Sequence, residues 1–400
     1  MNICRVVWDY PEGGLPSYGL QPVFYYLSQV QANQGHDVNV VARKVGSQPT
    51  EEADGNVLVH RVDPPFNVNG WRKVRAIIRN RKDSIVHTHA TAGLFMSLAK
   101  HLLKVPLVAH VHGTTHSHFM PVRLEYGDLK LGYSPIRLAY YHQREKLLWS
   151  SADRVVTVSS VIIRDLERFY SIPRKKIIPV YNGVDTDLFH PMDANGGVPQ
   201  GLEKFEGKRI ILYVGHFGLR KGLIYLLAAM GEIIKEVPDA ALVCIGGVPS
   251  WLKGGDYWKM LRTQVEDRRL SESVLLMDRI PNQLLPHYYS YSAVFVLPSY
   301  YESFSKVVAE AMACGKPVIS TKKGALEEVV ENGASGTLVD YGSSSQLSKA
   351  IIEILQDQKL ALKMGRKGRE RAETLFTWKA VASRLDKVYN SLNGSNDLHR

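Results

Sequence analysis

The chain has 400 residues, which is too long for one ordinary hydrophobic core and suits two domains. Its hydrophobic fraction of 45% is that of a folded globular protein and excludes a largely disordered chain. The net charge of +11 predicts an anionic partner, which could be a nucleotide, an anionic lipid surface or a nucleic acid.

The first residues and the cysteines indicate in which cellular compartment we expect the protein. The chain enters a strand-like run at once, without the long apolar region and cleavage site of a secretory signal. No apolar run approaches the roughly 20 residues that span a bilayer. Cys4, Cys244 and Cys314 have neither disulfide nor zinc spacing. We therefore expect buried, reduced thiols in a cytoplasmic protein.

Short β-branched runs alternate with helical patterns in the first half of the chain, which is typical of a parallel sheet with crossover helices. We expect strands at residues 3–8, 38–42, 57–62, 85–88, 107–111, 154–158 and 177–181. A Gly- and Pro-rich stretch then reaches Gly201 and has the composition of a linker.

A second alternating set predicts strands at residues 210–215, 241–245, 274–277, 294–297, 317–320 and 336–339. The two sets together indicate two doubly wound α/β domains. Such sheets bind ligands at the carboxyl ends of their strands, so a two-domain version would place its chemistry in the cleft between the domains.

The segment after the fourth strand of the second set carries the strongest functional signal. That strand ends at Pro298, a loop carries Glu302, and we expect a helix to begin near Phe304 and to present Glu310 two turns later. The unpaired amides at a helix start, together with the helix dipole, form an anion site suited to a diphosphate. A carboxylate on each side can accept hydrogen bonds from sugar hydroxyls. The pattern therefore indicates a nucleotide-sugar site.

Three runs in this segment, Glu-Ser-Phe-Ser from Glu302, Glu-Ala-Met-Ala from Glu310 and Gly-Lys-Pro-Val-Ile from Gly315, resemble the donor-site signature of the retaining family-four glycosyltransferases. The Asn-Gly-Val-Asp hinge from Asn182 and the terminal helix around 378–392 resemble further parts of that family, so the likeness covers nearly the whole chain. It implies the α/β GT-B fold, with two Rossmann-like doubly wound domains facing across a cleft. Residues 1–188 would form the acceptor-side domain, with a helix of about 376–400 packing back on it, and residues 189–375 the donor-binding domain.

The resemblance also implies an activity. A member of this family would move a hexose-type sugar from a nucleoside diphosphate sugar to a glycan, lipid-linked or small-molecule acceptor, with retention of anomeric configuration. It would need no metal and no cofactor beyond the donor substrate. A sugar phosphorylase on the same scaffold and a nucleotide-sugar binding protein without turnover are alternatives.

Site roles follow from the resemblance, residue by residue. Arg220 and Lys221, at a glycine-flanked turn after a strand, would stabilise the leaving diphosphate, one as a bidentate fork and one as a point charge. Glu302 and His112 would flank the donor sugar and complete the catalytic set. The remaining donor-binding residues implied are Gly215, Ile280, Phe304, Ser305, Lys306 and Glu310, the last for the ribose hydroxyls. Near Ile280, Asp278 stands where the family usually has glycine, so the choice of base stays open.

A Gly-Gly loop faces the diphosphate or the donor sugar in this family. Gly13 and Gly14 follow the first strand, but residues 15–18 separate them from the first helix. Gly19, directly before that helix, is the other candidate for this loop. The sequence leaves both alternatives open.

Two histidine pairs allow a different class of protein. His87 with His89, and His110 with His112, are i, i+2 pairs at the ends of neighbouring strands, so the members of each pair share one face. That spacing could hold a divalent metal in a metal-dependent hydrolase. No carboxylate pattern accompanies the pairs, and we expect no metal site. An Asp-x-Asp pattern at Asp185 lies in the interdomain turn, and we interpret it as hinge structure.

A basic region of the first domain predicts a possible second partner. Arg72, Lys73, Arg75, Arg79, Arg81 and Lys82 crowd one expected helix, and Lys100 and Lys104 lie on the next. This pattern suits peripheral docking at the inner, anionic face of a membrane, although a solvated face explains the same charges. No nucleic-acid-binding module accompanies the charge, so we expect no nucleic acid partner. The sequence does not predict an oligomeric state.

Overall fold

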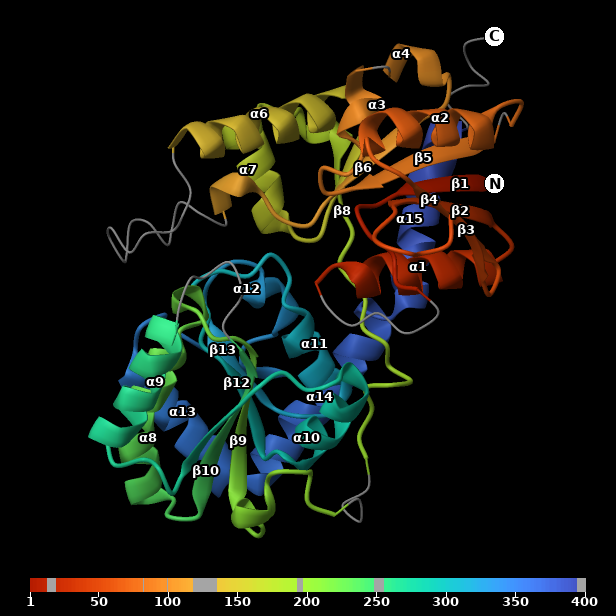
Figure 1. Cartoon of the computed structure of the whole chain (residues 1–400). Coiled ribbons are helices and arrows are strands. Elements are labelled where there is room, and N and C mark those ends of the chain that lie inside the picture. Colours follow the sequence, from red (N-terminus) through yellow and green to blue (C-terminus); the bar gives the residue numbers. More distant parts are fainter. Residues whose placement is uncertain are drawn as a thin grey trace. The chain divides into compact units, whose positions relative to one another are not determined.

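The computed structural model describes residues 1–12, 19–81, 83–98, 100–117, 135–192, 197–247 and 255–393 (Figure 1). The chain divides into two compact units. Unit 1 consists of Met1–Gly183 and Trp378–Arg400, and unit 2 of Val184–Thr377. The sequence placed these divisions after residues 188 and 375, so the first one lies earlier and the second one later than predicted.

Unit 1 is built on an eight-stranded sheet with the order β3-β4-β2-β1-β5-β6-β7-β8. Its strands are β1 (Asn2–Val6), β2 (Asp37–Arg43), β3 (Glu51–Asp54), β4 (Val57–Val62), β5 (Ser84–His89), β6 (Leu107–Val111), β7 (Arg154–Thr157) and β8 (Ile177–Pro179). All neighbours are parallel except β3, which runs antiparallel to β4 at the edge. The seven expected strands are present, and β3 is an addition that the sequence did not predict.

The helices of unit 1 are α1 (Gln21–Asn33), α2 (Phe66–Ile78), α3 (Leu94–Leu98), α4 (Lys100–Leu103), α6 (Pro135–Ser151), α7 (Ser160–Tyr170), the short 3-10 helix η1 (Arg174–Lys176) and α15 (Trp378–Asn393). The terminal helix α15 packs against α1 and joins the core of this unit, where the Tyr26 and Trp378 rings stack at 5.8 Å. A Cβ on Gly183 would lie 2.3 Å from the Trp378 ring, so only glycine allows this close contact.

Unit 2 is built on a six-stranded parallel sheet with the order β11-β10-β9-β12-β13-β14. Its strands are β9 (Arg209–His216), β10 (Ala240–Gly247), β11 (Val274–Met277), β12 (Val294–Leu297), β13 (Val318–Thr321) and β14 (Gly336–Val339), which are the six that the sequence predicts. Because neighbouring strands are parallel, their carboxyl ends share one edge of the sheet.

Helices cover both faces of this second sheet, with α8, α9 and α13 on one face and α10, α11 and α14 on the other (Figure 1). They are α8 (Leu223–Glu236), α9 (Gly255–Asp267), α10 (Leu285–Tyr291), α11 (Lys306–Ala313), α12 (Leu326–Val329), α13 (Ser344–Gln356) and α14 (Gln358–Leu375), with the short 3-10 helices η3 (Glu203–Phe205), η4 (Leu219–Lys221) and η5 (Asn282–Leu284). The helix expected near Phe304 begins at Lys306, and Glu310 lies one turn into it instead of the two turns that we expected.

Two further expectations can be compared with the structure. Cys4, Cys244 and Cys314 are free thiols in buried positions, as the sequence predicts. Burial raises the pKa of Cys4 and of Cys314 to about 12, so both remain protonated. Among the helices of the described residues, none combines the length and the apolar character that crossing a membrane requires.

Candidate functional site

A basic turn lies at the carboxyl end of β9 in unit 2. The strand ends at His216, and a short 3-10 turn follows it. Gly222 closes this turn with a φ of 66°, and a Cβ there would lie 2.0 Å from the carbonyl oxygen of Pro298, just after β12. Because only glycine fits this position, the turn packs against the neighbouring strand end and presents Arg220 and Lys221 there.

Lys221 and Glu302 form a buried ion pair at this edge of the sheet. Nζ of Lys221 lies 2.5 Å from Oε1 of Glu302, and the two residues are only 9% and 7% exposed. Burial favours the neutral carboxyl, but the charges of Lys221 and Arg220 outweigh it, so the pKa of Glu302 is lowered. Burial also lowers the pKa of Lys221, against the opposing effect of Glu302. Two cations therefore face one carboxylate, which leaves a net positive charge.

Backbone contacts hold the loop that carries Glu302. Nη1 of Arg220 donates a hydrogen bond to the carbonyl oxygen of Tyr301 at 2.7 Å, and the amide of Ala325 donates to that of Glu302 at 2.8 Å. Gly324 has a φ of 62°, and a Cβ there would lie 2.5 Å from the carbonyl oxygen of Glu302. The position of Glu302 therefore depends on the basic turn and on the glycine behind it.

Helix α11 begins directly after this loop with a strained residue. Its N-cap residue, Ser305, has a φ of 75°, a conformation that costs a non-glycine residue about 1–3 kcal/mol and that clusters at functional sites. The Ser305 side chain does not cap the helix, and its buried Oγ has no hydrogen-bond partner within the described residues. Phe304 packs against Phe376 at 5.3 Å and fixes this helix start. The first amides of α11 are therefore suited to bind an anion.

Glu310 lies one turn into α11. The hydroxyl of Tyr289, on α10, donates a hydrogen bond to Oε2 of Glu310 at 3.1 Å. Burial raises the pKa of Glu310, and the nearby charge of Lys306 opposes this effect. Tyr289 thus orients Glu310, and the sequence did not predict its role, because no motif marks a tyrosine on the preceding helix.

The end of β11, two strands away from β9 in the sheet, provides a third cation near the basic turn. The pKa of His216 is lowered to about 4 by partial burial and by the charges of Lys221, Arg279 and Arg220. Arg279 follows β11, and Ile280 is half-buried beside it. The three cations make this edge of the sheet electropositive, which favours an anionic ligand. His216 and Arg279 were not predicted as site residues.

The structure describes some of the glycines that were predicted to bind the donor, but not all of them. Gly215 pairs with Gly246 across β9 and β10, and a Cβ on Gly246 would lie 1.9 Å from the carbonyl oxygen of Gly215, so the two strands approach closely there. In unit 1, Gly19 has a φ of 58° and lies just before α1. Gly13 and Gly14 lie outside the described residues. The choice between them and Gly19 as the glycine loop therefore stays open.

His112 follows β6 in unit 1. Its Nε2 lies 3.0 Å from Nδ1 of His89, the last residue of β5. Both strands are parallel, and both histidines lie at the carboxyl edge of the sheet, as the sequence predicts. The predicted site residues of unit 2 thus lie after β9, β11 and β12 and on α11, whereas in unit 1 Gly19 lies just before α1 and His112 directly after β6.

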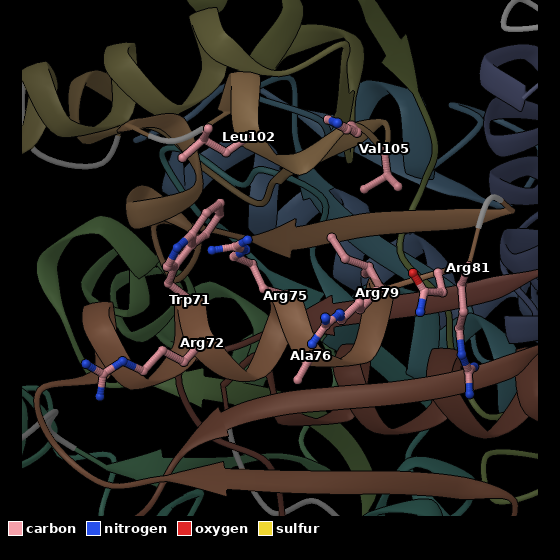
Figure 2. Close-up of a pocket in the computed structure, with 11 residues that line it drawn as sticks. Trp71, Arg72, Arg75, Ala76, Arg79, Arg81, Leu102 and Val105 are labelled. Carbon is pink, nitrogen blue, oxygen red and sulfur yellow. The ribbon is translucent and has the colours of Figure 1, made fainter.

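A basic groove of about 690 Å³ in unit 1 runs along α2 and reaches the amino ends of β5 and β6 (Figure 2). Its lining residues come from α2 and from the segments before β5 and β6: Trp71, Arg72, Arg75, Ala76, Ile78, Arg79, Asn80, Arg81, Leu102, Lys104 and Val105. Helix α2 ends at Ile78, so the expectation that Arg79 and Arg81 lie on it is wrong, and Lys82 lies outside the described residues.

The cations of this groove are poorly compensated. Arg81 forms an ion pair with Asp37, but no other described carboxylate lies within 4.0 Å of Arg72, Arg75, Arg79 or Lys104. The guanidinium of Arg75 lies over the Trp71 ring at 5.9 Å, and Leu102 is 53% exposed. The groove thus combines positive charge with exposed apolar surface.

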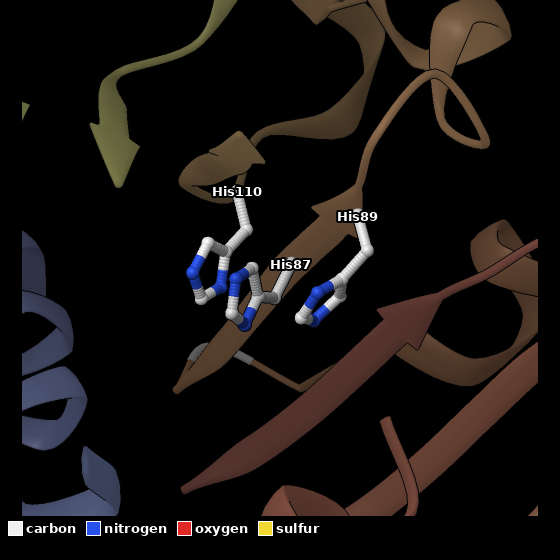
Figure 3. A group of neighbouring side chains, drawn as sticks. All are labelled: His87, His89 and His110. Atoms are coloured by element: carbon white, nitrogen blue, oxygen red, sulfur yellow. The ribbon is translucent and has the colours of Figure 1, made fainter. Parts of the chain in front are cut away.

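Three of the paired histidines come together in the core of unit 1 (Figure 3). One ring nitrogen from each of His87, His89 and His110 lies within 4.8 Å of the others, which is near the spacing of a metal site. All three are buried, and their pKa values are well lowered, first by burial and then by nearby positive charge that includes Arg5. No carboxylate belongs to this group among the described residues. The buried guanidinium raises the electrostatic cost of adding a divalent cation, which argues against a metal-dependent hydrolase.

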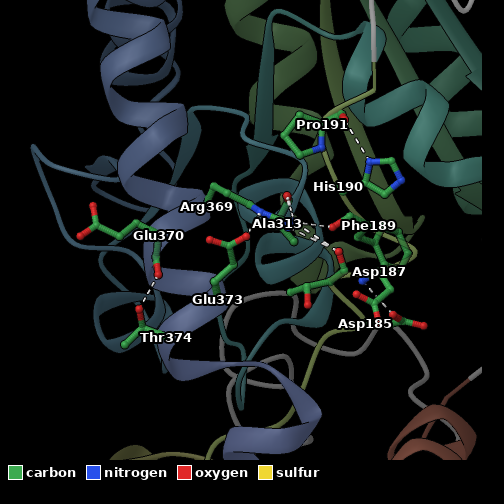
Figure 4. Close-up of polar contacts among 11 residues, drawn as sticks. Asp185, Asp187, Phe189, His190, Pro191, Ala313, Arg369, Glu370, Glu373 and Thr374 are labelled. Carbon is green, nitrogen blue, oxygen red and sulfur yellow. Dashed lines mark hydrogen bonds and ion pairs between the residues drawn. The ribbon is translucent and has the colours of Figure 1, made fainter.

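The Asp-x-Asp pattern is part of a turn (Figure 4). Oδ1 of Asp185 accepts a hydrogen bond from the amide of Asp187 at 3.1 Å. Arg369 on α14 then ties this segment to α11, since its Nη1 donates to the carbonyl oxygens of Phe189 at 2.8 Å and of Ala313 at 2.6 Å. These contacts support the interpretation of the pattern as hinge structure, because the Asp185 carboxylate is engaged by the backbone.

Two protein-family models match the chain. The model described as Glycosyltransferase Family 4 matches residues 18–188, and the model described as Glycosyl transferases group 1 matches residues 198–371. A D-inositol 3-phosphate glycosyltransferase of Segniliparus rotundus is 30% identical over 405 residues, which cover 96% of this chain and 86% of that relative.

Further similar proteins extend the comparison. Spore coat protein SA of Bacillus subtilis is 32% identical over 249 residues, which cover 60% of this chain and 65% of that relative, so the chain spans less than two thirds of its length. Anabaena Alr3699/HepE, solved in complex with UDP-glucose, has the same fold, with a TM-score of 0.72, 18% identity, and coverage of 98% of this chain and 100% of that one.

Proposed function

The chain belongs to the family-four glycosyltransferases of the GT-B fold, and from this membership we propose that it transfers a hexose-type sugar from a nucleoside diphosphate sugar to a glycan, lipid-linked or small-molecule acceptor, with retention of anomeric configuration. The observation that carries this proposal is the buried Lys221–Glu302 pair beside Arg220 and the start of α11. One edge of the sheet thereby offers net positive charge for a diphosphate and carboxylates for sugar hydroxyls.

Each group has a distinct role in the proposed reaction. Arg220, Lys221 and the first amides of α11 bind the diphosphate and stabilise the charge that develops on it as the glycosidic bond breaks. Glu302, oriented by Lys221, accepts hydrogen bonds from the donor sugar, and Glu310, oriented by Tyr289, accepts those of the ribose. His112 orients a hydroxyl on the other flank of the sugar. The leaving phosphate assists deprotonation of the acceptor, so no enzyme nucleophile is required.

The donor is proposed as UDP-glucose or a closely related nucleotide sugar, because Alr3699/HepE, which shares the fold, was solved with that compound. The backbone at Ile280, close to Arg279 and His216, would meet the base. The three cations at this edge supply the charge that a metal ion supplies in other transferases, and we therefore propose that the reaction needs no metal.

Nucleotide binding tests the proposal directly. Thermal stabilisation of the full chain is measured with UDP-, GDP- and ADP-sugars, with and without EDTA, for the wild type, Lys221→Ala and Glu310→Ala. We expect one nucleotide class to raise the Tm, with no effect of EDTA and no shift in the two variants. The exposed residues Lys349 and Glu327 provide matched Ala controls that should retain the shift.

Product analysis completes this test. Release of a nucleoside diphosphate and transfer of labelled sugar to an acceptor would support the transferase. A requirement for inorganic phosphate without nucleotide would indicate the phosphorylase instead. Binding without any turnover would indicate a binding protein, and a Tm shift that requires metal would contradict the proposed metal independence.

We further propose that the basic groove of unit 1 docks the protein at an anionic membrane, where a lipid-linked acceptor is available. This would place a cytoplasmic protein at the inner face of a membrane. Each Lys or Arg near such a surface contributes about 1 kcal/mol, and the exposed Leu102 adds apolar contact. The affinity for phosphatidylglycerol vesicles, measured by sedimentation, should therefore fall at least 100-fold in a triple variant with Arg72→Glu, Arg75→Glu and Arg79→Glu.

A variant of equal charge provides the control for this experiment. Lys359→Glu, Lys363→Glu and Arg366→Glu on α14 change the net charge equally and are exposed. They should leave vesicle binding nearly unchanged. An equal loss in both variants would mean that net charge alone explains the binding, and binding to phosphatidylcholine vesicles would contradict an electrostatic mode.

A further inference from the structure

Helix α6 has apolar side chains on two opposite faces. Leu148 and Trp149 are buried on the face that packs into unit 1. On the outer face Ile136, Tyr140 and Leu147 are 83%, 58% and 45% exposed. The outer face of such a helix is normally polar, so a second apolar face indicates contact with something outside unit 1.

The three exposed residues form one ridge along α6. They follow each other at intervals of four and seven residues, and both intervals return a side chain to nearly the same direction on an α-helix. The ridge from Ile136 to Leu147 is roughly 16 Å long at 1.5 Å per residue. Exposed apolar residues that are scattered singly need no explanation, but a continuous ridge is typical of an interaction surface.

Positive charge lies on both sides of the α6 ridge. The helical spacing places Arg137 and Arg144 on one side of it and Lys146 on the other. The guanidinium of Arg144 lies over the Tyr140 ring at 5.3 Å, so charge and apolar surface are in direct contact. The outer face of α6 therefore has the composition of a basic amphipathic helix.

The single acidic residue of α6 does not offset these cations at the surface. Glu145 is buried, and its Oε2 accepts hydrogen bonds from the Tyr170 hydroxyl at 2.5 Å and from the Thr115 amide at 3.1 Å. Its carboxylate thus belongs to the interior of unit 1. The outer face of α6 presents cations without a carboxylate of its own, which favours an anionic partner.

The α6 ridge and the basic groove lie in one layer of helices. Helix α6 packs against α3, and α3 packs against α2, on the face of the sheet that α1 and α15 do not cover (Figure 1). The exposed Leu102 of the groove lies on α4, which follows α3 along the chain. Helices of one layer turn their outer sides away from the sheet, so the ridge and the groove are parts of one basic and apolar surface.

An anionic bilayer fits this surface better than a second copy of the chain. A two-fold contact between two α6 ridges would bring the flanking cations of one copy against those of the other. In a bilayer the ridge reaches the acyl boundary, while the arginine and lysine heads remain among anionic headgroups. A tyrosine ring is also typical of the level at which headgroups and acyl chains meet.

We propose that α6 inserts its ridge into the surface of an anionic membrane, so that Ile136, Tyr140 and Leu147 supply the apolar part of the contact. This inference rests on the proposed docking of unit 1 at a membrane. It adds a contact that salt does not screen to the electrostatic attraction of the groove.

A dye at the ridge tests insertion directly. The native cysteines of the full chain are buried, so an environment-sensitive thiol dye can be attached at Leu147→Cys on the ridge or at Leu362→Cys, which is 67% exposed in unit 2. We expect phosphatidylglycerol vesicles with brominated acyl chains to quench the dye at position 147 and not at position 362. A dye at position 147 that stays in water while the protein is bound overturns the proposal.

Affinity provides a second measurement. A triple variant with Ile136→Ser, Tyr140→Ser and Leu147→Ser changes only exposed side chains and should keep the Tm of the wild type. In about 0.5 M NaCl, where charge is screened beyond a few ångströms, its affinity for phosphatidylglycerol vesicles should fall about 10- to 100-fold. Equal affinity of this variant and the wild type would contradict insertion of the ridge.

Exposed apolar residues elsewhere provide the matched control. Val45→Ser, Met192→Ser and Leu362→Ser remove side chains that are 52%, 42% and 67% exposed, and together they should leave the affinity nearly unchanged. An equal loss in both triple variants would overturn the role of α6. A change of the dye at position 147 with protein concentration, in the absence of vesicles, would show that a second copy covers the ridge and would also overturn the proposal.

The outcome for the groove stays separate from that for the ridge. Loss of binding only in the charge-reversal variant of α2 would support the proposed docking and refute insertion of α6. Loss only in the ridge variant, together with quenching at position 147, would contradict docking through the groove and support insertion. Neither result depends on sugar transfer, because vesicle binding is measured without a donor or an acceptor.

Discussion

At the residue scale, the Lys221–Glu302 pair should dominate the stability of the site. Lys221→Met leaves the buried carboxylate without its nearest cation, and removal of one partner of a buried pair costs about 3–5 kcal/mol. Lys221→Met with Glu302→Gln removes both charges and should cost much less. Urea unfolding of the two single variants and the double variant gives the coupling energy, and independent, additive losses would show that the pair is not coupled.

The same pair predicts a dependence on pH. The pKa of Glu302 is lowered in the folded state, so its contribution is complete above the unfolded value of about 4.3 and is lost as the pH falls through the folded value. In Lys221→Met the effect of burial is less opposed, and the variant should therefore recover part of its deficit at acidic pH. A deficit that stays constant from pH 7 to pH 4 would contradict this assignment.

His216 should report the arrival of the diphosphate. Its pKa of about 4 reflects partial burial and then three nearby cations, so an anion that neutralises these cations must raise it. By linkage, the nucleotide should bind more tightly as the pH falls through the raised pKa that His216 has in the complex. NMR titration of His216 with and without UDP measures this shift, and the exposed His190 serves as the control. A pKa that does not respond to the nucleotide would place the diphosphate elsewhere.

At the element scale, substitutions of two glycines distinguish the cost of a strained backbone from the displacement of the loop that carries Glu302. Gly324→Ala places a Cβ 2.5 Å from the carbonyl oxygen of Glu302, whereas Gly333 has a φ of 80° with nothing within 4 Å of its Cβ position. Both changes carry the cost of a left-handed residue, about 1–2 kcal/mol. Only Gly324→Ala should also weaken donor binding, which isothermal titration measures. An equal loss of affinity in both variants would show that the Glu302 loop does not depend on Gly324.

The elements that the sequence predicts best are those with a strong local pattern. Buried parallel strands are marked in the sequence by runs of β-branched residues, and for this reason all the strands that we expected are present. Strand β3, with the sequence Glu-Glu-Ala-Asp, has no such pattern, because it is held by an edge pairing and by the contacts of Glu51 with His60 and of Glu52 with the buried Arg61. Its existence depends on β4 and could not be inferred from its own residues.

The residues of the candidate site also divide into those that a local sequence pattern predicts and those that it does not. Arg220, Lys221 and Glu302 belong to short motifs, and local spacing places them near strand ends. Tyr289 and His216 act through contacts across elements, and the strained Ser305 could not be anticipated, because nothing in the sequence around it requires a positive φ. Sequence therefore predicts the groups that carry charge, whereas tertiary packing decides which residues orient them.

At the scale of the whole molecule, the two units each have their own sheet and core, so they should unfold in separable steps. The groups that we propose to bind the diphosphate belong to unit 2. A nucleoside diphosphate at 100 times its Kd should therefore stabilise that unit by about 2.7 kcal/mol. Differential scanning calorimetry should show two transitions, and UDP should raise mainly the transition of unit 2.

The two transitions can be assigned with one substitution in each core. Leu385→Ala in α15 should lower the transition of unit 1, and Leu227→Ala in α8 that of unit 2, since loss of a buried leucine costs about 2–5 kcal/mol. The UDP shift should persist in the first variant and follow the lowered transition in the second. A shift confined to the transition that Leu385→Ala lowers would mean that unit 1 holds the nucleotide, because a ligand stabilises only the folded unit that binds it.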